Sequence, residues 1–193
     1  MEQLELKSSD VALVVIDLQH GIVSVPTAPR PAAEIVENAA SLADALRKLG
    51  GLVVLVHVTP RADRKDALRP TADVPPAVPP ADPSWADLVP QLAGHAEDLV
   101  LTKRQWGAFY GTELDLQLRR RGIRTTILCG ISTNIGVEST ARDAYERGYD
   151  QILVEDAMAA RSAVEHEHTV RHIFPRLGRV RSTAAVLAAL KQG

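Results

Sequence analysis

The chain has 193 residues, 46% of them hydrophobic, and its 22 basic and 24 acidic side chains give a formal net charge of −2. This size and apolar content favour one folded domain, residues 1–193, and argue against global disorder. The balanced charge gives no electrostatic reason to bind nucleic acid or an anionic membrane, so we expect a small-molecule ligand.

Short apolar runs alternate with segments of helical periodicity along the chain. The expected strands are Val11–Ile16, Leu52–Val56, Asp98–Leu101, Thr125–Cys129, Gln151–Val154 and a short one at Val180. The expected helices are Pro31–Leu49, Thr112–Arg121, one from Thr133 or Asn134 to Arg147, Ala163–Phe174 and one from Thr183 onwards. Continuous apolar strands are typical of strands buried on both faces. The pattern therefore predicts an α/β, three-layer, doubly wound fold with a mostly parallel sheet covered by helices on both faces.

The location of the protein is expected to be cytoplasmic. The first ten residues are charged and lack the apolar core of a signal peptide. The longest apolar runs, such as Val11–Ile16, are too short to span a bilayer. The single cysteine, Cys129, can form neither an internal disulfide nor a thiolate metal site.

Residues 61–94 interrupt the alternation of strands and helices. They hold seven prolines and Trp85, and so many prolines exclude a regular helix or a central strand. A long ordered insertion is usually functional, so we expect a lid or a subunit contact, with a loose surface loop as the alternative. The Trp85 ring should be covered by another part of the protein.

Three features meet at one predicted edge of the sheet. Asp17 ends the first strand, Lys103 follows the third, and the turn Gly130–Gly136 leaves the fourth strand and opens a helix. Ligands of doubly wound folds bind at the carboxyl ends of the strands. A helix start also offers free backbone N–H groups to an anion or oxyanion. We therefore expect the functional site here, although each feature alone also fits an ordinary capping or solvent-exposed role.

Three stretches of the chain resemble the isochorismatase-like hydrolase superfamily in order and spacing. They are Val14–Gln19, with the sequence VVIDLQ; Lys103–Thr112, KRQWGAFYGT; and Leu128–Ala144, LCGISTNIGVESTARDA. The resemblance covers most of the chain, and it implies a six-stranded parallel sheet. Because proteins of this superfamily commonly assemble as dimers or tetramers, it also implies a homo-oligomer.

The resemblance implies specific roles at the predicted site. Asp17 matches the catalytic aspartate of the superfamily, and Lys103 matches its catalytic lysine. Gly136 stands where the cysteine-hydrolase branch, which includes nicotinamidases, has its nucleophilic cysteine. The Ile131–Ser132 peptide bond matches a non-prolyl cis bond of the superfamily. The amides of Ile135 and Gly136 would then face the ligand as donors.

Glycine at position 136 removes the usual covalent route, because it offers no nucleophilic side chain. We expect Gly136 to leave room for substrate or water instead. Cys129 lies seven positions earlier in an apolar strand, where a buried, inert thiol is the expected state. The segment His57–Asp63 lacks the Asp-x-His metal pattern of nicotinamidases. We therefore expect no metal and no other cofactor.

Several further residues are candidates for binding the substrate. Gln19 could hydrogen-bond the substrate or orient Asp17, and His57 is a candidate site wall or a packed histidine. The aromatic cluster after Lys103 could line the pocket or form a subunit contact. The substrate-binding candidates are Gln19, His57, Trp106, Phe109, Ser132 and Ile135. His166, His168 and His172 share one predicted helix and are interpreted as a solvated helix face rather than a metal site.

Three functions remain open on the sequence. The first is a hydrolase that acts without a cysteine nucleophile on a small carboxylated metabolite, for example a vinyl ether, with Asp17 as acid or base and Lys103 as its electrostatic partner. The turn Ile131–Glu138 differs from that of isochorismatases themselves and resembles a branch with glycine at this position. The alternatives are a catalytically silent relative that binds a small molecule or a protein, and a non-covalent amidase.

Overall fold

The computed structural model describes residues 4–75, 80 and 82–191. Within these residues, no helix is long and apolar enough to cross a membrane. The strands are β1 (Leu6–Lys7), β2 (Val11–Ile16), β3 (Leu52–Val58), β4 (Leu99–Lys103), β5 (Thr125–Ile131), β6 (Asp150–Ala159), β7 (Arg179–Arg181) and β8 (Leu190–Lys191). The helical segments are α1 (His20–Val23), α2 (Ala32–Lys48), η1 (Pro83–Ala86), α3 (Leu114–Arg120), η2 (Thr133–Val137), α4 (Glu138–Glu146), α5 (Ala163–His168), η3 (Thr169–Ile173), α6 (Phe174–Leu177) and α7 (Thr183–Ala189).

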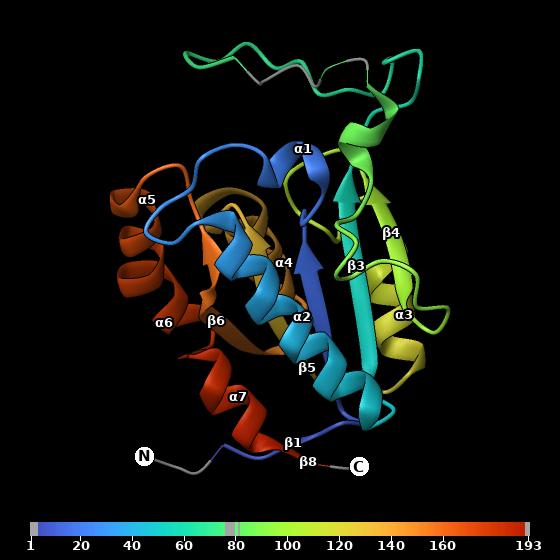
Figure 1. Cartoon of the computed structure of the whole chain (residues 1–193), viewed down its shortest axis with the longest axis vertical. Coiled ribbons are helices and arrows are strands. Elements are labelled where there is room, and N and C mark those ends of the chain that lie inside the picture. The colour runs from blue at the N-terminus through green and yellow to red at the C-terminus, as the bar shows by residue number, and fades with distance from the viewer. Residues whose placement is uncertain (1–3, 76–79, 81, 192–193) are drawn as a thin grey trace.

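Strands β2 to β7 form one parallel sheet in the order β4-β3-β2-β5-β6-β7 (Figure 1). All six residues of β2 are buried, because β3 and β5 flank the strand and helices cover both of its faces. This burial explains the continuous apolar run at Val11–Ile16. The predicted α/β fold with a six-stranded parallel sheet and helices on both faces is confirmed.

Alternate residues of β2 point into two separate cores. Leu13 and Val15 face the core beneath α2 and α7, whereas Val14 and Ile16 face the core beneath α3, α4 and α6. The apolar stripe of α2, at Ile35, Ala39, Leu42 and Leu46, is buried in the first core. The helical spacing in the sequence therefore identified the buried face of this helix.

Two features of the sheet differ from the sequence-based expectation. β1 and β8 form an additional two-stranded parallel sheet, too short to leave a periodic signal in the sequence. β6 was expected to end at Val154 but continues to Ala159, because Gly130 pairs with Met158 after a shift in register. The acidic residues that interrupt its apolar run include Asp156, whose carboxylate accepts hydrogen bonds from the backbone N–H and the hydroxyl of Thr183.

The proline-rich segment leaves the body of the protein beyond the end of β3, and η1 returns the chain to it (Figure 1). Residues 76–79 and 81 of this segment lie outside the described residues. The Trp85 ring is half-buried and lies against Gly21, where an added Cβ would come within 2.0 Å of the indole. Another part of the protein therefore covers this ring, as the sequence led us to expect.

The predicted insertion, residues 61–94, extends too far at its C-terminal end. Leu88 already pairs with Gln19, and Val89 and Leu92 are buried in the core beneath α2. The chain has thus rejoined the body of the protein by residue 88. Pro90 lies between the two core residues, Val89 and Leu92, and interrupts the apolar periodicity that would have predicted their burial.

Gly130 allows the site end of β5 to approach β2. Its backbone φ is +122°, and an added Cβ would lie 2.0 Å from the Ile16 carbonyl oxygen. Only glycine combines this conformation with so close an approach to backbone.

We expect Gly130→Ala to lower the free energy of unfolding by more than about 3 kcal/mol, the upper end of ordinary single substitutions. Gly122→Ala is the matched control, since Gly122 also has a positive φ, +69°, but has open space around it. The control should cost about 1–2 kcal/mol, for the left-handed backbone alone. Urea denaturation measures both values, and equal losses for the two variants would contradict the close approach.

Candidate functional site

Asp17 follows β2 directly and adopts an unusual backbone conformation. Its φ is +54°, in the left-handed region that residues other than glycine rarely adopt. Its N–H donates to the Val56 carbonyl at 2.9 Å, so the residue is still tied to β3. Such a conformation persists where surrounding contacts determine it, and it is common at functional sites.

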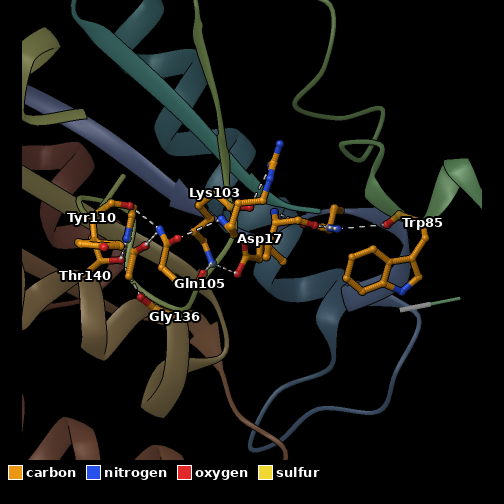
Figure 2. Close-up of polar contacts among 12 residues, drawn as sticks. Asp17, Trp85, Lys103, Gln105, Tyr110, Gly136 and Thr140 are labelled. Carbon is orange, nitrogen blue, oxygen red and sulfur yellow. Dashed lines mark hydrogen bonds and ion pairs between the residues drawn. The ribbon is translucent and has the colours of Figure 1, made fainter. Parts of the chain in front are cut away.

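Lys103, the last residue of β4, forms a buried ion pair with Asp17. The Lys103 Nζ lies 2.7 Å from the Asp17 Oδ2, and it also donates to the Gln105 carbonyl at 3.1 Å (Figure 2). The exposed fraction is 2% for Lys103 and 6% for Asp17. Two residues 86 positions apart are thus brought together at the carboxyl edge of the sheet.

Burial and pairing act in opposite directions on the pKa of the Asp17 carboxyl. Burial raises the pKa of its carboxyl to about 6, while the charge and hydrogen bond of Lys103, and to a smaller extent His57, pull the pKa down. Its second oxygen, Oδ1, is buried and has no hydrogen-bond partner among the described residues. A carboxyl with this pKa and an unused oxygen can accept or deliver a proton near neutral pH.

The chain turns from β5 into a helix directly beside this pair. The Ile131–Ser132 peptide bond is cis, as the resemblance implies, and the helical segment η2 begins at Thr133. The expectation that the Ile135 amide is free for a ligand is wrong, because this N–H donates to the Ser132 carbonyl at 3.2 Å. Ser132 itself is half-buried.

Gly136 lies in contact distance of the ion pair. An added Cβ would be 3.2 Å from the Asp17 Oδ2 and 2.9 Å from the Ile16 Cγ2. The expected position of Gly136 beside Asp17 is therefore observed, but the expected room for substrate or water at the place of a side chain is not. The Ile16 Cγ2 is bonded to the branched Cβ of a central-strand residue and cannot move aside easily. Glycine thus brings the helix backbone itself against the carboxylate.

Cys129 is separated from this edge by its burial in the core beneath α2. Its exposed fraction is 0%, and burial raises the pKa of its thiol to about 12. A thiol with so high a pKa is not a nucleophile at neutral pH.

Gln19 and His57 hold the structure around the site rather than facing an open cleft. The Gln19 amide exchanges hydrogen bonds with the N–H and carbonyl of Val58 and donates to the Trp85 carbonyl. The His57 ring nitrogens bond the Ala86 carbonyl at 2.8 Å and the Thr102 hydroxyl at 2.7 Å. Both residues therefore connect the end of β3 to η1, and neither has a ring or amide nitrogen left over for a substrate.

The aromatic cluster after Lys103 divides between the core and the surface. Phe109 is buried and packs on Tyr149, with ring centroids 5.8 Å apart. It therefore belongs to the core, which corrects its expected place in the pocket wall. Trp106 is 60% exposed and Tyr110 is 75% exposed, so their side chains are accessible to a ligand or a second subunit.

Sequence reasoning missed several residues that locate the helix start. Thr140 on α4 hydrogen-bonds both Gly136 and Ala108. Thr133 bonds the His166 Nδ1 at 2.9 Å. His166 is 4% exposed, so the predicted solvated face is wrong for this residue, although His168 and His172 are exposed. Isolated threonines and one histidine in helices carry no periodic signal that would distinguish them from surface residues.

The described residues contain no group of three His, Cys, Asp or Glu side chains that could hold a metal ion. A hollow of about 400 Å³ lies at the opposite, amino edge of the sheet, where Asp10, Arg124 and Asp150 contribute to its lining. It is remote from Asp17 and Lys103 and is not part of the site described here.

We expect the Cys129 thiol of the native protein to resist alkylation by iodoacetamide at pH 8, because it is buried and its pKa is raised. The same thiol should react within minutes in 6 M urea, which mass spectrometry would show as a single added carbamidomethyl group. Rapid labelling of the native protein would instead restore Cys129 as a candidate nucleophile.

Comparison with known proteins identifies the family of this chain. The isochorismatase domain model matches residues 11–185. The chain is 49% identical over 187 residues to the isochorismatase family protein YecD of Escherichia coli O157:H7, covering 97% of this chain and 100% of that protein. It is 31% identical over 179 residues to the ureidoacrylate amidohydrolase RutB of Variovorax paradoxus, covering 81% and 71%.

The structure also superimposes on a solved isochorismatase family protein from Burkholderia thailandensis. The TM-score is 0.93 at 46% identity, and the match covers 97% of this chain and 98% of the other. Family model, relatives and solved structure thus agree over nearly the whole chain. The chain therefore belongs to the isochorismatase family and is a hydrolase of that family.

Proposed function

We propose that this hydrolase acts on a small carboxylated metabolite without a covalent enzyme intermediate. Asp17 exchanges the proton with the reactants, and Lys103 is its electrostatic partner. The observation that supports this most is the buried ion pair: Lys103 and the glycine at position 136 both lie at the Asp17 Oδ2, and the Asp17 Oδ1 has no hydrogen-bond partner among the described residues. An attacking nucleophile must then come from water, since Gly136 supplies none and Cys129 is buried.

In an amide substrate, Asp17 would act first as a base. The carboxylate accepts a proton from water while the water oxygen bonds to the scissile carbonyl carbon. The proton then passes to the leaving nitrogen, and the C–N bond breaks to release an amine and a carboxylic acid. Lys103 donates two hydrogens within the protein, which leaves one for a substrate oxygen. This route is supported by the ion pair, which favours the ionised carboxylate, and by the similarity to an amidohydrolase.

In a vinyl ether, Asp17 would act first as an acid. The neutral carboxyl protonates the enol-ether carbon, and water then bonds to the resulting oxocarbenium ion and gives one of its protons back to the Asp17 carboxylate. The neutral hemiketal collapses as its C–O bond to the leaving group breaks, which yields a ketone and an alcohol. Burial supports this route, because it raises the pKa of Asp17 to about 6. A fraction of the protein then carries the acid at neutral pH.

We expect one functional domain in the cytoplasm that assembles as a homo-oligomer. We propose that the accessible Trp106 and Ser132 lie at the rim of the substrate site. The proline-rich segment that begins at Arg61 remains a candidate lid or subunit contact.

We expect Asp17→Asn to lower turnover by at least about 10²-fold, because the proton carrier is lost. The substrates for this assay are isochorismate, ureidoacrylate and a panel of related vinyl ethers and ureido acids, followed by mass spectrometry. Cys129→Ala is the control and should retain activity, since its side chain is buried away from the pair. Undiminished turnover by Asp17→Asn would remove Asp17 from the mechanism. Absence of turnover in the folded wild-type protein on every substrate would favour a silent binder.

The pH profile of kcat/KM separates the two routes, because Asp17 has a pKa of about 6. We expect the rate to rise with pH through about 6, as the base form accumulates. A rate that falls through this value would assign the acid role and the vinyl-ether route. A profile without an inflection between pH 5 and 7 would contradict proton exchange by Asp17.

A further inference from the structure

We propose that Thr140 is a positioning residue. Its hydroxyl ties the loop after Lys103, residues 104–111, to the helix start that contains Gly136, and this loop in turn holds the Lys103 ammonium in place. This inference rests on the proposed function of the Asp17–Lys103 pair. The inference concerns how the loop after Lys103 and the helix start at Gly136 keep their relative position, since the two bonded residues, Ala108 and Thr140, are more than thirty positions apart in the sequence.

The Thr140 hydroxyl acts both as a hydrogen-bond donor and as an acceptor. It donates to the Gly136 carbonyl at 2.7 Å and accepts from the Ala108 N–H at 3.1 Å (Figure 2). The Thr140 side chain has an exposed fraction of 0%, so water cannot replace either partner. One buried oxygen therefore joins the turn at Gly136 to the loop at Ala108.

Hydrogen bonds within the loop connect Ala108 to the carbonyl that binds the Lys103 ammonium. The Gln105 side-chain amide donates to the carbonyls of Gly107, at 3.0 Å, and Tyr110, at 2.5 Å. The backbone carbonyl of the same Gln105 accepts from the Lys103 Nζ at 3.1 Å (Figure 2). Fixing Ala108 thus fixes the carbonyl that holds the ammonium in place.

The loop also lies directly on α4 next to Thr140. An added Cβ at Gly107 would be 3.1 Å from the Asp143 Oδ2 and 3.6 Å from the Ser139 Cβ. The absence of a side chain at Gly107 lets the loop approach the helix closely enough for the Ala108 N–H to reach Thr140. The contact is therefore a packed surface with one hydroxyl at its centre.

Loss of this hydroxyl should weaken the hold of Lys103 on Asp17. Valine has the shape of threonine but cannot accept from Ala108, so a buried N–H would be left unpaired. The loop would then move away from α4, and the Lys103 ammonium with it. Lys103 and His57 are the charged or titratable groups that lower the pKa of Asp17, so a retreat of Lys103 lets burial raise that pKa further.

The test is the ¹³C NMR titration of the Asp17 carboxyl in Thr140→Val, Thr140→Ser and the wild-type protein. We expect Thr140→Val to move the midpoint upward by about half a unit or more, and Thr140→Ser, which keeps the hydroxyl, to restore it. Thr126→Val is the matched control. Thr126 is also fully buried, but its hydroxyl has no partner among the described residues, so this change should leave the midpoint unaltered.

A folded Thr140→Val protein in which Asp17 titrates as in the wild type would overturn the proposal. If Thr140→Val does not fold, hydrogen exchange of the wild-type Ala108 amide decides: protection equal to that of α4 supports the anchor, and fast exchange overturns it. Neither readout requires turnover. The titration can therefore exclude the positioning role of Thr140 while the turnover assay still supports hydrolysis by Asp17. Equally, the titration can support the positioning role while the turnover assay excludes Asp17 from hydrolysis.

Discussion

The ion pair between Asp17 and Lys103 is the constraint on which the site depends. Two charges buried at 2.7 Å from each other need a dry, fixed environment, and removing either partner typically costs about 3–5 kcal/mol because the other is left uncompensated. Burial and pairing act on Asp17 in opposite directions, and burial prevails to give a pKa of about 6. The pair therefore includes a carboxyl that changes protonation near neutral pH.

The parallel sheet makes this arrangement possible. β2 and β4 both end at the carboxyl edge with β3 between them, so residues distant in sequence meet across one strand. β5 completes the site from the other side of β2, where Gly130 permits close approach to Ile16 and Gly136 brings the helix backbone against Asp17. The hydroxyl of Thr140 then ties this helix to the loop after β4. Contacts from all of these elements therefore fix the positions of Asp17 and Lys103.

The sequence could predict the parts of this structure that depend on local pattern. The continuous apolar run Val11–Ile16 and the helical stripe of α2 reflect burial along a whole element, which composition and spacing report directly. The strand tips were predicted to meet because topology alone brings them together. The location of Asp17 and Lys103 at one edge of the sheet could therefore be predicted, but their buried ion pair could not.

The parts that depend on tertiary contact could not be predicted in the same way. The acidic interruption of β6 is accommodated by the hydrogen bond from the Thr183 N–H to the Asp156 carboxylate. Phe109 is buried through its ring contact with Tyr149. The lack of room at Gly136 depends on the position of one methyl group of Ile16. His166 is buried because Thr133 offers it a hydrogen bond. No local pattern encodes any of these partners.

The most direct test of the account is the pKa of the Asp17 carboxyl, measured by ¹³C NMR in the wild-type protein, in Lys103→Met and in Arg104→Met. The neighbouring Arg104 is the control, because its guanidinium pairs with Asp66 instead of Asp17. We expect a midpoint near 6 in the wild type and in Arg104→Met, and a clearly higher midpoint in Lys103→Met, where burial acts unopposed. A wild-type midpoint near 4 that Lys103→Met leaves unchanged would mean that the carboxylate is neither buried nor paired, which contradicts the account.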